Sequence, residues 1–156
     1  MATEKWISGS GVGLTWTAAF STEINSIVNT NAILSSVSIA NGTPLDIFAD
    51  ISIALGSITS GAGAPYIGFY LYPLNQDGST YGDGRFGSSA AGPPLSQYFV
   101  GAVPLIPSVT QAQEGAVTGI IMPPGTFKFV AYNLSGATLA ASSNTFSYRT
   151  YNRSVA

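Results

Sequence analysis

The sequence predicts an all-β protein, an antiparallel β-sandwich that is jelly-roll-like, with an extended N-terminal arm and one short helix. Apolar residues alternate with polar ones in several segments after residue 31, which is the period of a strand with one buried face. Glycine and proline, at 18 and 9 of the 156 residues, separate these segments as turn formers. Strands divided by such turns indicate a sandwich or a barrel. The pattern leaves an immunoglobulin-like sandwich open as a second topology.

Residues 1–20 are expected to form the extended arm. The run Ser8–Gly13 has glycine at every second position, and glycine at this density opposes helix and favours irregular backbone. Large aromatic side chains punctuate the arm, and rings of this size are suited to anchoring it on a surface. These candidate interface residues are Trp6, Trp16 and Phe20.

A short helix is expected at 22–28, directly after the arm. Ser21 provides an N-cap, and Ile24 and Ile27 follow at helical spacing. We therefore divide the chain into an N-terminal arm with its short helix, 1–30, and a β-sandwich domain, 31–156.

The clearest strand is Leu45–Leu55, where every odd-numbered residue is apolar and Asp46 and Asp50 fall on the opposite face. The segment Ile33–Ile39 precedes the turn dipeptide Asn41-Gly42, so we expect it to pair with 45–55 as a hairpin. The remaining expected strands are Tyr66–Tyr72, Gln97–Val103, Ala116–Met122, Thr126–Tyr132, Leu139–Ala141 and Thr145–Tyr151.

A long connection, 74–96, separates two of these strands. Connections longer than about 12–15 residues in a compact domain are usually functional or disordered. This one contains Tyr81, Arg85 and Phe86, anchors that a plain linker does not need, so we expect an ordered contact loop. Its stretch 77–84 carries two aspartates, but Gly, Ser, Thr and Tyr separate them. Calcium loops place oxygen ligands at every second position, so a turn is favoured and no metal site is expected.

Charged residues make up 8% of the chain, where soluble domains usually carry about 25%. A protein exposed to water on every side normally uses charge for solubility and to prevent association. With 46% hydrophobic residues as well, the composition favours a surface that is buried against protein partners over a merely serine- and glycine-rich domain. The five basic residues are spread along the chain, so no nucleic acid partner is expected.

The chain has no histidine and no cysteine, so the commonest general base, the thiolate nucleophile and the preferred zinc ligands are missing. A glycosidase needs only a pair of carboxylates. Asp46 and Asp50, however, fit solubilising charge on the outer face of a strand equally well. We expect no enzymatic activity and no cofactor. No secretory leader and no uninterrupted apolar run of about 20 residues is visible, so no membrane partner is expected.

Three tyrosines, Tyr66, Tyr70 and Tyr72, alternate with apolar residues and should share one face of their strand. They could form an aromatic platform that stacks sugars. They could equally be a hydrophobic outer face covered by the arm or by a neighbouring protein, because tyrosine combines an apolar ring with a polar tip.

Several stretches resemble small structural proteins of tailed-bacteriophage virions. They are Gly13–Trp16 leading to Phe20, Tyr72–Phe86, Pro123–Lys128 and the ending Tyr148–Arg153. The resemblance covers most of the chain and rests on turn and strand signatures, so it carries no site motif.

This resemblance implies a jelly-roll capsid decoration (cement) protein that binds and stabilises the outer surface of a phage capsid. Such a protein would be made in the host bacterial cytoplasm, reside in the virion, and bind the major capsid protein as a homo-oligomer, a dimer or trimer. A tail or head–tail accessory protein and a carbohydrate-binding adsorption module are the alternatives.

Overall fold

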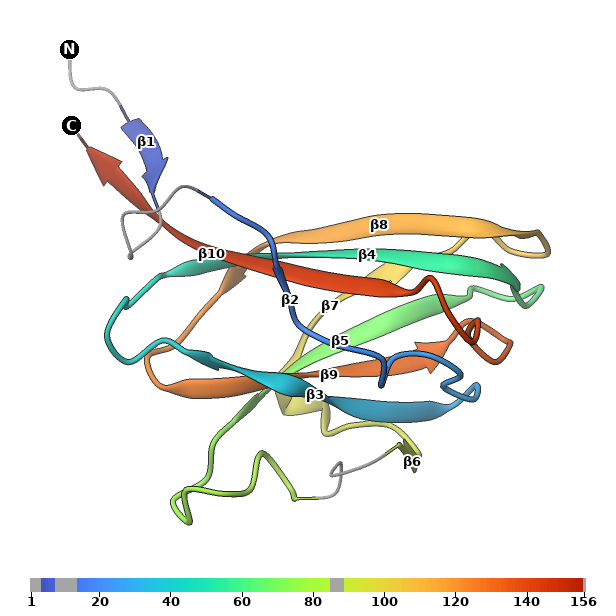
Figure 1. Ribbon diagram of the computed structural model, residues 1–156, viewed down its shortest axis with the longest axis horizontal. Helices are drawn as coiled ribbons and strands as arrows, with labels where there is room; N and C mark the ends of the chain where they lie inside the picture. Colours follow the sequence, from blue (N-terminus) through green and yellow to red (C-terminus); the bar gives the residue numbers. More distant parts are fainter. Residues whose placement is uncertain (1–3, 8–13, 85–88, 156) are drawn as a thin grey trace.

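The structure is a computed structural model that describes residues 4–7, 14–84 and 89–155, and it places them in two facing antiparallel sheets (Figure 1). The upper sheet has the order β1-β10-β4-β8, with β2 also paired to β10, and the lower sheet has the order β6-β3-β9-β5-β7. The strands are β1 (Glu4–Ile7), β2 (Thr17–Ala18), β3 (Asn31–Ala40), β4 (Phe48–Thr59), β5 (Tyr66–Pro73), β6 (Ala90–Ala91), β7 (Phe99–Pro104), β8 (Thr110–Ile121), β9 (Thr126–Leu134) and β10 (Thr145–Val155), and the 3₁₀ turn η1 (Ser96–Tyr98) precedes β7.

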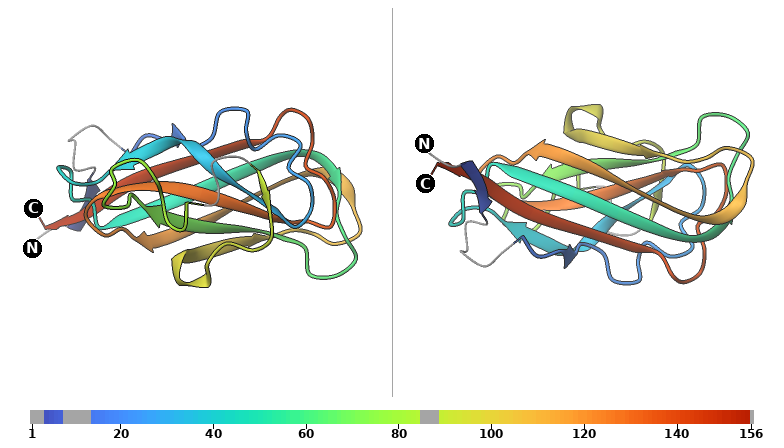
Figure 2. Two further views of the ribbon diagram at one scale, coloured as in Figure 1. Left: turned by 90° about the horizontal axis from the view of Figure 1, so that it is seen from below. Right: turned by 90° about the horizontal axis from the view of Figure 1, so that it is seen from above.

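The long strands alternate between the two sheets along the chain. With the short β1 and β6 set aside, the sheets read β2-β10-β4-β8 and β3-β9-β5-β7. Seen from above, β10, β4 and β8 lie side by side (Figure 2, right). Each connection crosses to the other sheet except the one from β5 to β7, which pair with each other. This is the double Greek-key order of a jelly roll, so the predicted fold class is confirmed.

The core lies between the sheets because their inward residues are apolar. In β4, Ala49, Ile51 and Ile53 are almost fully buried, as the period-two pattern predicts. Phe146 on β10 occupies the middle of this core. Its ring centroid lies 4.7 Å from that of Phe20, 4.8 Å from that of Phe69 and 5.3 Å from that of Phe129.

A second apolar layer covers the outer face of the lower sheet. Tyr70, Tyr72 and Tyr132 are buried there. The described parts of the connection between β5 and β7 run along this outer side of the sheet (Figure 1). The Leu95 N–H donates a 2.9 Å hydrogen bond to the Tyr72 hydroxyl oxygen, and the Tyr98 ring centroid lies 4.7 Å from that of Tyr72. The described parts of the long connection therefore pack on their own domain.

The predicted helix at 22–28 is wrong, because these residues form a series of turns. Ser26 has a φ of 57°, which ends any helical run. The backbone bonds to other segments instead: Ser26 N–H donates to Ala140 O at 3.1 Å, and Leu139 N–H donates to Ile27 O at 3.0 Å. A helix of two turns has little stability of its own, so burial of the apolar side chains against the sheets decides the local structure.

The predicted hairpin of 33–39 with 45–55 is also wrong, because β3 and β4 lie in opposite sheets. Asn41 does not form a tight hairpin turn; it stabilises the connection that crosses from one sheet to the other. Its amide nitrogen donates to Asp46 O at 2.8 Å, and its amide oxygen accepts from Asp46 N–H at 2.8 Å. The strand therefore begins at Phe48, and Leu45 and Ile47 remain exposed in the crossing.

The expected strand at 139–141 is absent from the described structure, where these residues form irregular backbone. Leu139 is nevertheless buried and contributes to the core. Leu139 is apolar because it packs beside the 21–28 turns, and an apolar residue in that role does not indicate a strand.

The described parts of the N-terminal arm lie along β10. Glu4 pairs with Val155 at one end of β1, and Ala18 pairs with Ser147 in β2. Phe20 is buried in the core. The arm is thus an edge of the upper sheet.

Candidate docking face

An apolar row crosses the outer face of the upper sheet at the end where β4 begins and where β8 and β10 end. Figure 1 shows that these strand ends lie at one end of the sandwich. Tyr151 on β10 is directly opposite Phe48 on β4, and Phe48 is directly opposite Ile121 on β8. Directly opposite residues of an antiparallel pair share one face. Trp6 adds to the row, with its ring centroid 5.3 Å from that of Tyr151 and 6.0 Å from that of Phe48. We call Trp6, Tyr151, Phe48 and Ile121 the apolar row.

The two ends of the row are open to solvent. Ile121 is 73% exposed and Trp6 is 55% exposed. Singly scattered apolar side chains are normal on a protein surface, but a contiguous set is typical of an interaction site.

The apolar row continues into a groove at the edge of the sandwich. Ile121 forms part of its wall together with Phe99, which is 48% exposed. The groove has a volume of about 410 Å³, and none of its lining residues is charged. Other lining residues are Tyr98, Pro123, Pro124 and Phe127. The apolar surface therefore extends from the upper sheet to the starts of β7 and β9.

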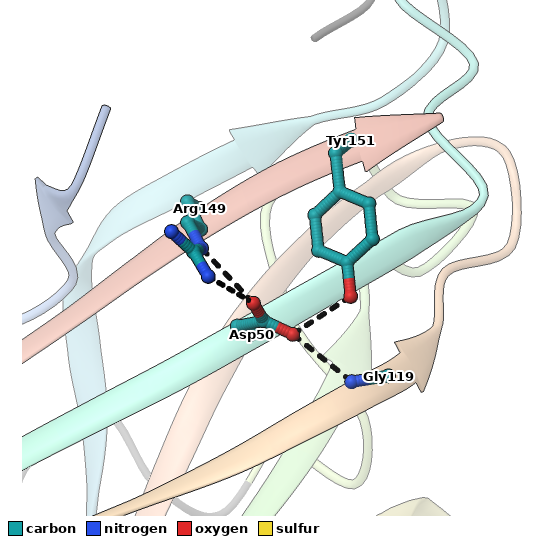
Figure 3. Close-up of polar contacts among 4 residues, drawn as sticks. All are labelled: Asp50, Gly119, Arg149 and Tyr151. Atoms are coloured by element: carbon teal, nitrogen blue, oxygen red, sulfur yellow. Dashed lines mark hydrogen bonds and ion pairs between the residues drawn. The ribbon is translucent and has the colours of Figure 1, made fainter. Parts of the chain in front are cut away.

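A buried carboxylate, Asp50, lies beside the apolar row (Figure 3). Its Oδ2 accepts hydrogen bonds from Nε and Nη2 of Arg149, at 2.9 and 2.8 Å. Its Oδ1 accepts from the Tyr151 hydroxyl at 2.8 Å and from the Gly119 N–H at 3.0 Å. Gly119 has a φ of 70° at an irregularity in the β4–β8 pairing, a conformation that glycine adopts without strain.

These bonds use the hydrogen-bonding capacity of Asp50 and hold the Arg149 side chain along the outer face, toward β4. The ring of Trp16 lies over the guanidinium, 4.6 Å from its central carbon to the ring centroid. The charges of Asp50 and Arg149 are thus paired with each other, and a carboxylate with four accepted bonds has little left to offer a ligand. This arrangement suits docking against a protein surface better than recognition of a hydroxyl-rich ligand, because few polar groups here need a new partner.

The pKa of Asp50 lies below its ordinary value of 3.8. Burial raises the pKa, but the bonds from Gly119, Tyr151 and Arg149 to the ionised form outweigh burial. A lowered folded-state pKa stabilises the fold above the unfolded-state pKa, and this contribution is lost as the pH falls.

The difference in the free energy of unfolding between the wild type and Asp50→Asn should therefore be constant above about pH 5 and shrink below about pH 4. Urea unfolding of both proteins across this range measures it. Other carboxylates titrate in both proteins and cancel in the difference. A difference that stays unchanged down to the acid limit would contradict the assigned role of Asp50.

From the sequence, Asp46 and Asp50 are interpreted as solubilising charge. The structure corrects this interpretation, because both residues are buried. Asp46 accepts hydrogen bonds from Thr150 Oγ1 at 2.5 Å and from Asn152 Nδ2 at 2.9 Å. Asp50 does lie on the outer face, as predicted, but its partners cover it. Both carboxylates therefore hold β10 in place.

The sequence-predicted interface residues fall in different surroundings. Trp6 and Trp16 lie on the outer face of the upper sheet and are 55% and 44% exposed, whereas Phe20 is buried. Tyr81 lies on the far side of the molecule, beside the lower sheet, with Lys128 Nζ 5.1 Å from its ring centroid. Arg85 and Phe86 lie outside the described residues.

The tyrosine face of β5 is largely covered. Tyr70 and Tyr72 are buried, and Tyr66 is half-buried. Burial and the neighbouring tyrosines raise the pKa of Tyr70. The cover is the chain's own connection between β5 and β7, so Tyr70 and Tyr72 offer no open ring face for a sugar.

Sequence reasoning missed Phe48, Ile121 and the Asp50–Arg149 pair as parts of one surface. Their separation along the chain is large, so only the strand order brings them together. One signal was present: Arg149 and Tyr151 sit two residues apart in a strand pattern and therefore share a face.

Among residues 4–7, 14–84 and 89–155, no cluster of three or more acidic side chains is placed to hold a metal ion. Over the same part of the chain, no helix has the length and apolar character needed to cross a membrane.

No protein-family model matches the chain, and no curated protein matches it. In structure the chain is similar to the CBM36-1 domain of a multidomain xylanase from the hindgut metagenome of Trinervitermes trinervoides. The two share 7% sequence identity with a TM-score of 0.36, over 99% of this chain and 97% of the other. A likeness at this level carries no argument about function.

Proposed function

We propose that this protein is a non-enzymatic structural module that docks on a larger protein assembly through the apolar row and its adjoining groove. The single observation that carries the proposal is the extent of uncharged, exposed apolar surface between Trp6 and Phe99. Removing such surface from water favours association by about 25 cal/mol per Å², before the entropic cost of association is subtracted. A chain with 8% charged residues also has few groups that would have to be desolvated.

The assembly that we propose is the outer surface of a phage capsid, where the protein would act as a decoration (cement) protein on the major capsid protein. The support for this choice is the sequence resemblance to tailed-phage structural proteins. A ligand that binds only the intact lattice stabilises it in proportion to occupancy and affinity. The same face would serve a tail or head–tail protein, and a reconstruction of the particle distinguishes these positions.

Replacing Ile121 by aspartate should weaken binding to capsids that lack the protein by about 10- to 100-fold. The reason is that a buried isoleucine contributes about 1.5–3 kcal/mol, and each 1.4 kcal/mol is tenfold in affinity. Co-sedimentation of purified protein with such capsids measures the change.

Ile106→Asp is the matched control, because Ile106 is 56% exposed and precedes β8, whereas Ile121 ends it. This control should bind like the wild type. Equal binding of both variants would reject the apolar row as the docking surface. Light scattering of the free protein and of Ile121→Asp would also show whether the row joins copies into the proposed dimer or trimer.

A further inference from the structure

A second hollow lies on the outer side of the lower sheet, away from the apolar row. It has a volume of about 410 Å³, within the range of about 300–1,000 Å³ that small-ligand pockets occupy. Its walls come from the 74–84 segment and the 21–28 turns, and its base comes from β3 and β9. The residues that matter for its chemistry are Glu23, Leu34, Ser36, Ser79, Tyr81 and Lys128.

The wall that carries Tyr81 is held rigidly on the sheet. Gly82 lies so close to Tyr72 that a Cβ built on it would be 2.0 Å from a ring carbon of Tyr72. The side chain of Asn75 donates to Gly82 O at 2.9 Å, and Leu74 forms a β-bridge with Tyr81. The backbone that carries Tyr81 is therefore fixed on the sheet.

The base of the hollow is opened by an irregularity in β3 between Leu34 and Ser38. Irregularities of this kind re-aim side chains and occur next to binding sites. Ser36 is exposed here, and its N–H donates to Glu23 at 2.6 Å. Ser21 N–H donates to the other carboxylate oxygen of Glu23 at 2.8 Å. The acid in the hollow is thus engaged in holding the turn segment.

The basic residue of the hollow, Lys128, is not engaged in this way. Lys128 pairs in register with Ser38 and Tyr72, which sets it on the outer face of the lower sheet. Its ammonium lies 5.1 Å from the centroid of the Tyr81 ring. Among the residues that the structure describes, this ammonium has no ion pair and no hydrogen bond, so its three donors are available.

We propose that this hollow binds a sugar residue that bears a carboxylate, as in an acidic polysaccharide. Lys128 would pair with the carboxylate, and the hydroxyls of Ser79 and Tyr81 would meet the sugar hydroxyls. Leu34 supplies apolar surface for the C–H face of the ring. The site lies on the opposite sheet from the apolar row, so one copy could occupy a particle and a polysaccharide together.

Calorimetric titration of the full-length protein with trigalacturonate tests the proposal. The uncharged galactotriose of the same linkage and sodium acetate serve as the neutral sugar and the bare carboxylate. Trigalacturonate should bind at least about tenfold more tightly than either, because a hydrogen bond to a charged group is stronger than one between neutral groups. Lys128→Met should reduce its affinity by about tenfold or more, and Tyr81→Phe by a few-fold.

Arg153→Met is the matched control, because it removes the same charge from an exposed residue elsewhere on the chain and should leave the affinity unchanged. Absence of trigalacturonate binding would overturn the proposal, as would equal binding of acetate or equal losses in the Lys128 and Arg153 variants. Far-ultraviolet circular dichroism confirms that the variants fold, and Tyr81→Phe provides the second test if Lys128→Met does not. Ile121→Asp should bind the sugar with unchanged affinity. The sugar-binding proposal can therefore fail or hold independently of the docking proposal.

Discussion

Replacing Asp50 by alanine should lower the free energy of unfolding by about 2–4 kcal/mol. Removal of one partner of a buried ion pair typically costs about 3–5 kcal/mol, because the other charge is left without compensation. Here the side chain of Arg149 is 30% exposed, so water relieves part of that cost and the expected loss is smaller. The Tyr151 hydroxyl and the Gly119 N–H also lose their acceptor.

Urea unfolding followed by tryptophan fluorescence measures this loss. Glu114→Ala is the control, because Glu114 is an exposed acid on the neighbouring strand β8 and its removal should change stability little. The double variant Asp50→Ala/Arg149→Met should recover part of the loss, since no unpaired charge then remains. If Asp50→Ala were as stable as Glu114→Ala, the pair would not anchor β10.

Replacing Phe20 by alanine should lower the free energy of unfolding by about 3–5 kcal/mol, the usual range for a buried phenylalanine. Phe20 is 4% exposed, and its ring meets that of Phe146 in the middle of the core. The truncation would leave a cavity that the two sheets cannot close, because β2 and its neighbours are held by pairing with β10.

Trp16→Ala is the matched comparison, because Trp16 is an aromatic residue of the same N-terminal segment but is 44% exposed. Its replacement should cost about 1 kcal/mol, mainly through the lost contact with Arg149. Thermal unfolding of the two variants side by side separates the roles. If Phe20→Ala cost no more than the small loss expected for Trp16→Ala, Phe20 would not belong to the core.

The sequence could predict the fold class because strand alternation is local. In 45–55 the apolar period identifies the inner face, and Ile51 and Ile53 do lie in the core. The partner of a strand is not local. Asn41-Gly42 resembles a hairpin turn, but the side chain of Asn41 binds Asp46 and Pro123, which directs the chain across to the other sheet.

Only part of the candidate site could be predicted from the sequence, because the strands that form it are not neighbours along the chain. Trp6 and Trp16 stood out because large rings in a glycine-rich segment need a surface to contact. The burial of Asp50 depends on Arg149, which is 99 residues further along the chain. Likewise, the alternation of Tyr70 and Tyr72 defined a face, while the segment that covers it follows from the jelly-roll connections.

The place of β10 within its sheet has a consequence for how the protein reaches this structure in the cell. β10 is the last of the described strands, yet it lies inside the upper sheet, paired with β2 on one side and with β4 on the other. Phe146, which fills the middle of the core, also arrives with it. Domains whose contacts are mostly between distant residues fold slowly. The sheets can therefore close only after residues 145–155 have left the ribosome, and until then the apolar inner faces are exposed to aggregation.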